Sequence, residues 1–170
     1  MVVNKVFDAN VYINDASTHG MASEVSCPEV SAKMDEYPAL GMYIPVSLPN
    51  GIEAMELSIK WTMPSNEVMI AMANSMQAVD LAIFSSKAVF NNSGKVEEQK
   101  IAINVRGFPK KHQGGSFKAR EDSEFENTIA VFYYRIEVNG QEIMEVDAMN
   151  NIYTVDGVDM LEQRKANLGI

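Results

Sequence analysis

Apolar and polar residues alternate with a period of two over much of the chain, which is the pattern of half-buried β-strands. The alternation is clearest between Glu53 and Trp61, between Glu98 and Arg106, and from Glu124 onwards. The side chains predicted to face the core are Met55, Leu57, Ile59, Trp61, Ile101, Ile103, Val105, Phe125, Ile129, Val131 and Tyr133. The sequence therefore predicts a mainly β fold, a barrel or a sandwich.

Turn signals join these strands into hairpins. Asn139-Gly140 lies between two β-rich runs and supplies both positive-φ positions of a type I′ turn, and Ser93-Gly94 is a weaker signal of the same kind. Two long hairpins are predicted, over approximately residues 22–61 and 96–138. Residues 45–51 are expected to form a poor strand, because their prolines cannot donate to a β-ladder.

Two short helices are predicted to flank the strands. The first follows Pro64, where Ser65 can cap free amides, and its apolar stripe is Val68, Met69, Met72, Ala73 and Met76. These methionines are interpreted as core packing. The second follows Asp156-Gly157, ends at Gly169, and carries Val158, Leu161, Lys165 and Leu168 along one side. No linker divides the chain, so residues 1–170 are expected to form a single domain.

Composition excludes several function classes. Cys27 is the only cysteine and His19 and His112 are the only histidines, so neither an internal disulfide nor a Cys/His zinc site is expected. The formal net charge of −9 argues against tight DNA binding, which needs a cationic surface. The amino terminus lacks a secretory signal pattern and no apolar run is long enough for a membrane anchor, so a soluble domain is expected.

No catalytic or cofactor motif stands out. Ser85-Ser86 has no nucleophile elbow, and adjacent acids such as Glu97-Glu98 point to opposite faces of a strand. The phosphate-loop, dinucleotide, zinc-protease and redox motifs are all missing. The protein is therefore predicted not to be an enzyme, with no catalytic residues, no cofactor and no metal.

One basic cluster and the strand edges remain to be explained. Lys110, Lys111, His112, Lys118 and Arg120 are too few, and too poor in aromatic neighbours, for a nucleic-acid patch, which favours a loop that forms salt bridges. Long strands with two usable faces leave unpaired edges, and such edges invite pairing with another chain. The residues thus predict self-assembly.

Three groups of motifs then occur in order along the chain. The first comprises Val6-Phe7-Asp8-Ala9-Asn10-Val11-Tyr12-Ile13-Asn14, Pro28-Glu29-Val30, Lys33-Met34-Asp35-Glu36-Tyr37 and Gly41-Met42, and the second is Gly51-Ile52-Glu53-Ala54-Met55-Glu56. The third comprises Tyr133-Tyr134-Arg135, Asn139-Gly140, Val146-Asp147, Val155-Asp156-Gly157-Val158-Asp159 and Leu168-Gly169-Ile170. Together they resemble the major tail tube protein of contractile-tailed bacteriophages, a family shared with the tubes of R-type bacteriocins.

The resemblance implies a structural protein of the virion tail, assembled in the host bacterial cytoplasm. It implies hexameric rings that stack into a hollow inner tube, with the two long hairpins of neighbouring copies closing into one β-barrel. Expected partners are further copies of the chain, the tail sheath protein, and the baseplate or tube-initiator and tail-terminator proteins. DNA would pass through the lumen without tight binding, since six copies at −9 each give a formal charge of −54 per ring.

The alternation and the resemblance together suggest candidate site residues. Those expected to line the lumen are Glu29, Lys33, Asp35, Glu56, Lys60, Glu98, Lys100, Glu124 and Glu126. Those expected to form the contact between rings are Lys110, Lys111, Gly114, Gly115, Lys118 and Arg120, together with residues 45–51 and the amino terminus. The sequence leaves open a DNA-free injection particle and a monomeric β-sandwich binding module.

Overall fold

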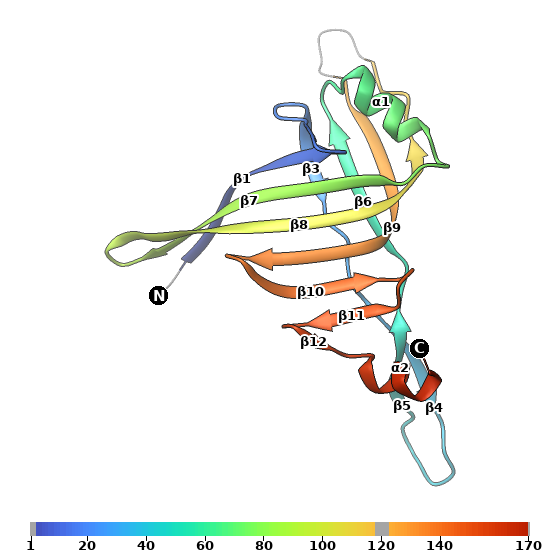
Figure 1. Cartoon of the computed structure of the whole chain (residues 1–170). Coiled ribbons are helices and arrows are strands. Elements are labelled where there is room, and N and C mark those ends of the chain that lie inside the picture. Colours follow the sequence, from blue (N-terminus) through green and yellow to red (C-terminus); the bar gives the residue numbers. More distant parts are fainter. Residues whose placement is uncertain (1–2, 118–122, 170) are drawn as a thin grey trace.

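The computed structural model describes residues 3–117 and 123–169 (Figure 1). The strands of the first half are β1 (Val3–Ile13), β2 (Ala16–Ser17), β3 (Ala22–Ser26), β4 (Ala32–Tyr37), β5 (Val46–Ile52) and β6 (Met55–Trp61). Those of the second half are β7 (Val79–Asn91), β8 (Gly94–His112), β9 (Phe125–Val138), β10 (Gln141–Asp147), β11 (Ile152–Val155) and β12 (Val158–Asp159). The helices are α1 (Asn66–Ala73) and α2 (Glu162–Leu168). The mainly β prediction is confirmed.

The strands form two layers that cross, with β8 and β9 running through both. A wide layer has the order β12-β11-β10-β9-β8-β7-β1-β2. The first half of β9 instead pairs with β6, and β6 pairs with β3, which makes a narrow layer together with the end of β8. Figure 1 shows β6 and the first half of β9 running across the direction of β7. The sheet of a single copy is not closed into a barrel.

A bend in β8 and β9 moves both strands from one layer to the other. Arg106 pairs with Tyr133 and Gly107 with Val131, so Phe132 bulges out of the ladder. Bulges of this kind bend strands at the corners of crossed layers. An alanine Cβ at Gly107 would lie 2.6 Å from the Ile129 Cγ2 atom and closer still to the carbonyl oxygen of Ala130. The corner therefore requires glycine.

The core fills the space between the layers. The predicted alternation in β6 is confirmed, because Met55, Leu57, Ile59 and Trp61 are all buried. In β9 the prediction for Tyr133 was wrong: the Phe132 bulge reverses the alternation, so that Tyr134 joins the core instead. Other core side chains come from both layers, among them Val11, Leu81, Ile83, Ile103, Val105, Ile129 and Val131.

Helix α1 covers one end of the core, and its predicted start after Pro64 is confirmed. The Ser65 side chain accepts a hydrogen bond from the Val68 amide and so caps the helix. Val68 and Met72 are buried in the core, which confirms core packing for those two positions. Ala73 and Met76 were wrongly placed on the apolar stripe; both are exposed, and Met76 lies beyond the end of the helix.

The two predicted turns and the two predicted long hairpins are confirmed. Asn139 and Gly140 have φ values of 52° and 83° and join β9 to β10, and the segment 91–94 joins β7 to β8. In the first long hairpin β3 pairs with β6, and further out β4 pairs with β5. In the second, β8 pairs with β9.

Two element predictions need correction. Residues 45–51 mostly do form a strand, β5, which contains Pro49. The proline is tolerated because β4 is the one described strand that pairs with β5 and a register shift lies nearby. The second helix begins at Glu162, later than predicted, because Asp156 and Gly157 form the turn that leads into β12. Val158 therefore belongs to a strand, while Gly169 ends the helix in a left-handed conformation as predicted. No helix within the described ranges is long and apolar enough to span a membrane.

Candidate functional site: an apolar arm and open strand edges

The β4–β5 hairpin forms an arm, residues 32–52, that projects from the body at the end opposite α1 (Figure 1). Its large apolar side chains are exposed, namely Met34, Tyr37, Leu40, Met42, Tyr43, Ile44, Val46 and Leu48. Leu40 and Tyr43, near the tip, are as accessible as in an extended chain. An isolated two-stranded hairpin is marginally stable in water, and clustered exposed apolar residues mark interaction sites. The arm therefore lacks a covering surface in a single copy.

The narrow layer has an open edge on each side. On one side β3 pairs with β6 and with no other described strand. On the other side, the pairing of β7 with β8 ends at Gly107, so residues 108–112 of β8 pair only with β9 within the described ranges. Apart from Pro109, which has no N–H, the residues of each edge present backbone groups that can hydrogen-bond to a strand of another copy.

The outer face of the narrow layer, opposite the core, is charged. It carries Glu56, Lys60 and Glu126 from the predicted lumen set, and the pairing of Lys60 with Glu126 across β6 and β9 brings them together. The Lys60 ammonium lies 2.7 Å from the Glu24 carboxylate, and this hydrogen bond raises the pKa of Lys60. We refer to Glu24, Glu56, Lys60, Lys110, Lys111 and Glu126 as the charged face.

The remaining lumen candidates lie elsewhere. Glu29 precedes the arm, and Lys33 and Asp35 lie on the arm itself. Glu98 and Lys100 lie on the part of β8 that pairs with the distal half of β7, where Lys100 Nζ is 4.5 Å from the centroid of the Phe84 ring. The structure therefore brings together only part of the predicted set, with Glu124 close enough to influence Lys60.

The predicted ring-contact residues lie at the end of the β8–β9 hairpin. Lys110 forms an ion pair with Glu56, and Lys111 Nζ is 3.5 Å from Glu126 Oε2, so both lysines belong to the charged face. Gly115 has a φ of +94° and lies against the Phe125 ring. Gly114 has open space around it. Lys118 and Arg120 lie outside the described residues.

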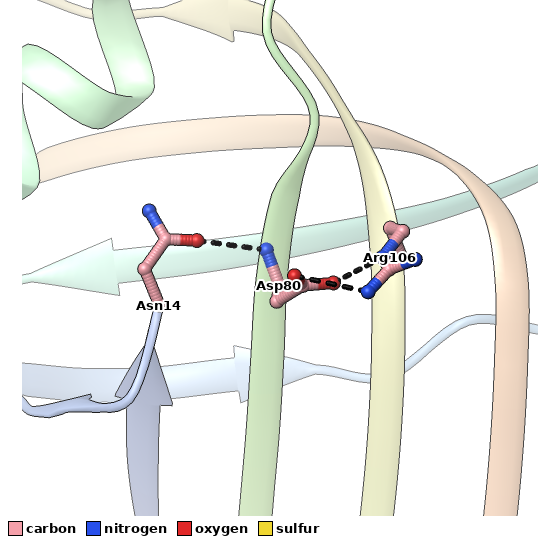
Figure 2. A network of polar contacts seen from close by, with 3 residues as sticks. All are labelled: Asn14, Asp80 and Arg106. Carbon is pink, nitrogen blue, oxygen red and sulfur yellow. Dashed lines mark hydrogen bonds and ion pairs between the residues drawn. The ribbon is translucent and has the colours of Figure 1, made fainter.

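A polar network that the sequence did not predict fixes the start of β7 (Figure 2). The Asp80 amide donates to Asn14 Oδ1 at 3.1 Å, and the Asp80 carboxylate accepts two hydrogen bonds from the Arg106 guanidinium. The bidentate hydrogen bond is the main cause of a raised Arg106 pKa. Detecting this network in the sequence requires the registers of β1, β7 and β8, because Asp80 lies opposite Arg106 only once β7 and β8 are aligned.

The network borders a cleft on the wide layer with a volume of about 920 Å³. Tyr12, Phe108, Tyr133 and Asp147 contribute to its walls. Burial opposes ionisation of Asp147, but hydrogen bonds from the Asn150 side chain and from the Asn150 and Met149 amides lower the pKa of Asp147 from its ordinary value. Its carboxylate thus stabilises the fold above its unfolded-state pKa, and that contribution is lost as the pH falls through the folded-state value.

The charged and polar side chains described above form ion pairs with one another or hydrogen bonds that hold turns. Within residues 3–117 and 123–169 no three histidine, cysteine, aspartate or glutamate side chains gather as metal ligands. The features that stand out in one copy are its uncovered arm and its open edges. Both are properties of a subunit that assembles.

Comparisons with known proteins agree with the resemblance in sequence. A family model described as "Phage tail tube protein FII" matches residues 3–169. The tail tube protein of Escherichia phage P2 is 28% identical over 165 residues, which cover 95% of this chain and 94% of that protein.

Two solved structures share the fold. A chain in the structure of the sheath/tube terminator of PVC, an extracellular contractile injection system, has a TM-score of 0.59 and 18% identity, over 78% of this chain and 95% of that chain. A chain of the PVC sheath-tube complex has a TM-score of 0.56 and 18% identity, over 76% and 87%. Since the family model covers nearly all of the sequence, this chain belongs to the family of phage tail tube proteins of the FII type.

Proposed function

We propose that this chain forms the hollow inner tube of a contractile tail, as hexameric rings that stack along one axis. The observation that carries the proposal is the arm, whose apolar side chains have no covering surface in a single copy. Contact with a neighbouring ring removes those side chains from water. A contact between unlike faces of a subunit repeats along an axis and so builds a tube of any length.

Ring closure follows from the two open edges of the narrow layer. The free edge of β3 in one copy and residues 108–112 of β8 in the next are suited to pair as β-strands. Repeated around a ring, this pairing produces one closed barrel with no unpaired edge, which a single copy does not achieve. The charged face then lines the bore, and the outer face of the wide layer becomes the outer wall.

Electron microscopy of the purified protein tests the proposal directly. We expect rings with sixfold symmetry and hollow tubes in negative stain, and a concentration-dependent rise in mass by light scattering. A protein that remains monomeric at all accessible concentrations would contradict the tube and would favour a monomeric binding module. Inside a tail the outer wall would contact the sheath, and the two ends of the tube would contact the initiator and terminator proteins, after assembly in the host cytoplasm.

The lumen proposal makes a prediction about DNA. Glu56→Gln with Glu126→Gln should leave tubes intact but slow DNA release from complete particles, because a wall with less negative charge repels DNA less within the screening distance of about 8 Å. Dye fluorescence follows the release. The matched control is Glu67→Gln with Glu162→Gln, which removes the same charge from the two helices. Equal release rates for both pairs would contradict electrostatic repulsion at this face.

The predicted ring contact makes a second prediction. Lys110→Glu with Lys111→Glu should impair polymerisation, because each change places like charges beside Glu56 or Glu126. The exposed ion pairs that are lost contribute at most about 1 kcal/mol each, so the subunit should remain folded. Sedimentation of tubes measures the effect. The control Lys110→Gln with Lys111→Gln loses the same ion pairs without adding like charges, so it should leave tubes intact. Normal tubes from the glutamate variant would contradict the assignment.

A DNA-free injection particle is the second candidate, favoured by the likeness to chains of an extracellular contractile injection system. The subunit and its assembly would be the same in that case. The cargo in particles isolated from cells distinguishes the two, since DNA inside complete particles identifies a phage tail.

A further inference from the structure

The only tryptophan of the chain is connected by hydrogen bonds to the end of β8. Trp61 is completely buried, and its indole Nε1 donates to Asn127 Oδ1 at 3.0 Å. Asn127 is 3% exposed, and its Nδ2 lies 3.0 Å from His112 Nδ1 and 3.4 Å from the carbonyl oxygen of Lys111. A buried indole is thus connected through one amide to an exposed histidine.

The chemistry of these groups fixes the protonation of His112. An indole N–H only donates, so the Asn127 oxygen must face Trp61. The Asn127 NH2 group must then face His112, and it too only donates. His112 Nδ1 therefore accepts, which requires a neutral imidazole with its proton on Nε2.

A proton on His112 disrupts this arrangement. Nδ1 becomes a donor and opposes the donor of Asn127 at 3.0 Å. Rotating the Asn127 amide offers its oxygen to the imidazolium but leaves the Trp61 N–H buried with no acceptor. Either outcome costs at least one hydrogen bond, since rotation also removes the one from Asn127 Nδ2 to the Lys111 carbonyl. His112 is the exposed member of the three.

The end of β8 continues into the stem of the β8–β9 loop. The Gln113 amide donates to the Glu126 carbonyl, the Ser116 amide donates to the Glu124 carbonyl, and the Phe117 ring lies edge-on against Phe125. The same segment contains Lys110 and Lys111. His112 therefore adjoins residues for which we have proposed a role in assembly.

Among the described residues, the charged groups near His112 come from β8, β9, β6 and α1. They are Lys110 and Lys111 on β8, Glu126 on β9, Glu124 just before β9, and Lys60 on β6. Helix α1 contacts β8, and its only charged side chain is Glu67. Glutamates ordinarily titrate below pH 5.5 and lysines above pH 8. A histidine side chain ordinarily changes charge between these limits.

We propose that protonation of His112 breaks its link to Trp61, loosens the end of the β8–β9 hairpin and makes assembly depend on pH. The link is a property of the single subunit. Its effect on assembly rests on the proposed function, so the two parts are tested by separate measurements.

The first measurement follows Trp61 in dilute, unassembled protein from pH 8 to pH 5.5. Tryptophan fluorescence and the NMR shift of the indole N–H both report on this residue alone. We expect a reversible one-proton transition in the wild type and in His19→Gln, which removes the only other histidine. His112→Gln retains an acceptor for Asn127 but does not titrate, so its signal should stay constant. A constant wild-type signal, or a transition that persists in His112→Gln, would overturn the link.

The second measurement compares the critical concentration for tube formation at pH 8 and pH 5.5. We expect a rise of about two- to tenfold at pH 5.5 in the wild type and His19→Gln, the range that one hydrogen bond supports, and no such rise in His112→Gln. If Trp61 titrates but the critical concentrations are equal, the regulation of assembly is wrong while the link stands. If no tubes form at either pH, the proposed function fails, and the Trp61 measurement still decides the link.

Discussion

Replacing Leu40, Tyr43 and Ile44 together with serine is expected to abolish tube stacking while leaving the subunit folded. Each of these side chains is at least 71% exposed in a single copy, so none contributes to the core. Burying one large apolar side chain contributes about 1.5–3 kcal/mol, and losing three of them per subunit raises the critical concentration by at least about three orders of magnitude. Electron microscopy and sedimentation should show dispersed subunits or single rings in place of tubes.

The matched control retains apolar area at the same positions. Leu40→Ile, Tyr43→Phe and Ile44→Leu should assemble at nearly wild-type concentrations. The free energy of unfolding of the serine variant in urea should lie within about 0.5 kcal/mol of the wild-type value, because exposed positions contribute little to stability. Tubes of normal length from the serine variant would show that the arm does not hold rings together.

Replacing Gly107 with alanine is expected to have the largest effect on folding. The added methyl group would lie 2.6 Å from Ile129 Cγ2 and closer to the backbone oxygen of Ala130, which has no rotamer through which to move away. Overpacking typically costs 1–3 kcal/mol, and a clash with backbone at a bend should reach about 3 kcal/mol or more. Urea or thermal unfolding measures the loss.

Gly114→Ala provides the control within the same hairpin. A Cβ at Gly114 meets no atom within 4 Å, and its φ is not positive. The change should therefore be neutral or stabilising by up to about 1 kcal/mol, through the unfolded chain. Equal unfolding midpoints for the two variants would mean that β8 and β9 can cross at this corner without glycine.

Local patterns predicted the elements they control directly. The alternation in β6 identified four core side chains, and Asn139-Gly140 identified the β9–β10 turn. The error at Tyr133 has a non-local cause. The Phe132 bulge exists because β9 bends opposite Gly107, which lies 25 positions away in the sequence, and no period within β9 reveals that partner.

The candidate site was predictable to a similar extent. Alternation places Glu56, Lys60 and Glu126 on one face because β6 and β9 pair directly, and the structure puts them there. The same reasoning grouped Glu98 and Lys100 with them. Those two residues lie on the part of β8 that belongs to the wide layer, whereas the end of this 19-residue strand belongs to the narrow layer. The alternation along a strand predicts which face a side chain lies on, but it does not predict the layer to which that part of the strand belongs.

The passage of β8 and β9 through both layers has a mechanical consequence. A push or twist applied to the outer wall of a tube would travel into the inner wall along two continuous backbones and the ladder between them. The two walls then cannot slide past one another without bending both strands at Gly107 and Phe132. The resistance of the tube to shear would accordingly depend on that one bend. A more flexible bend would let the bore deform when the tail contracts around it.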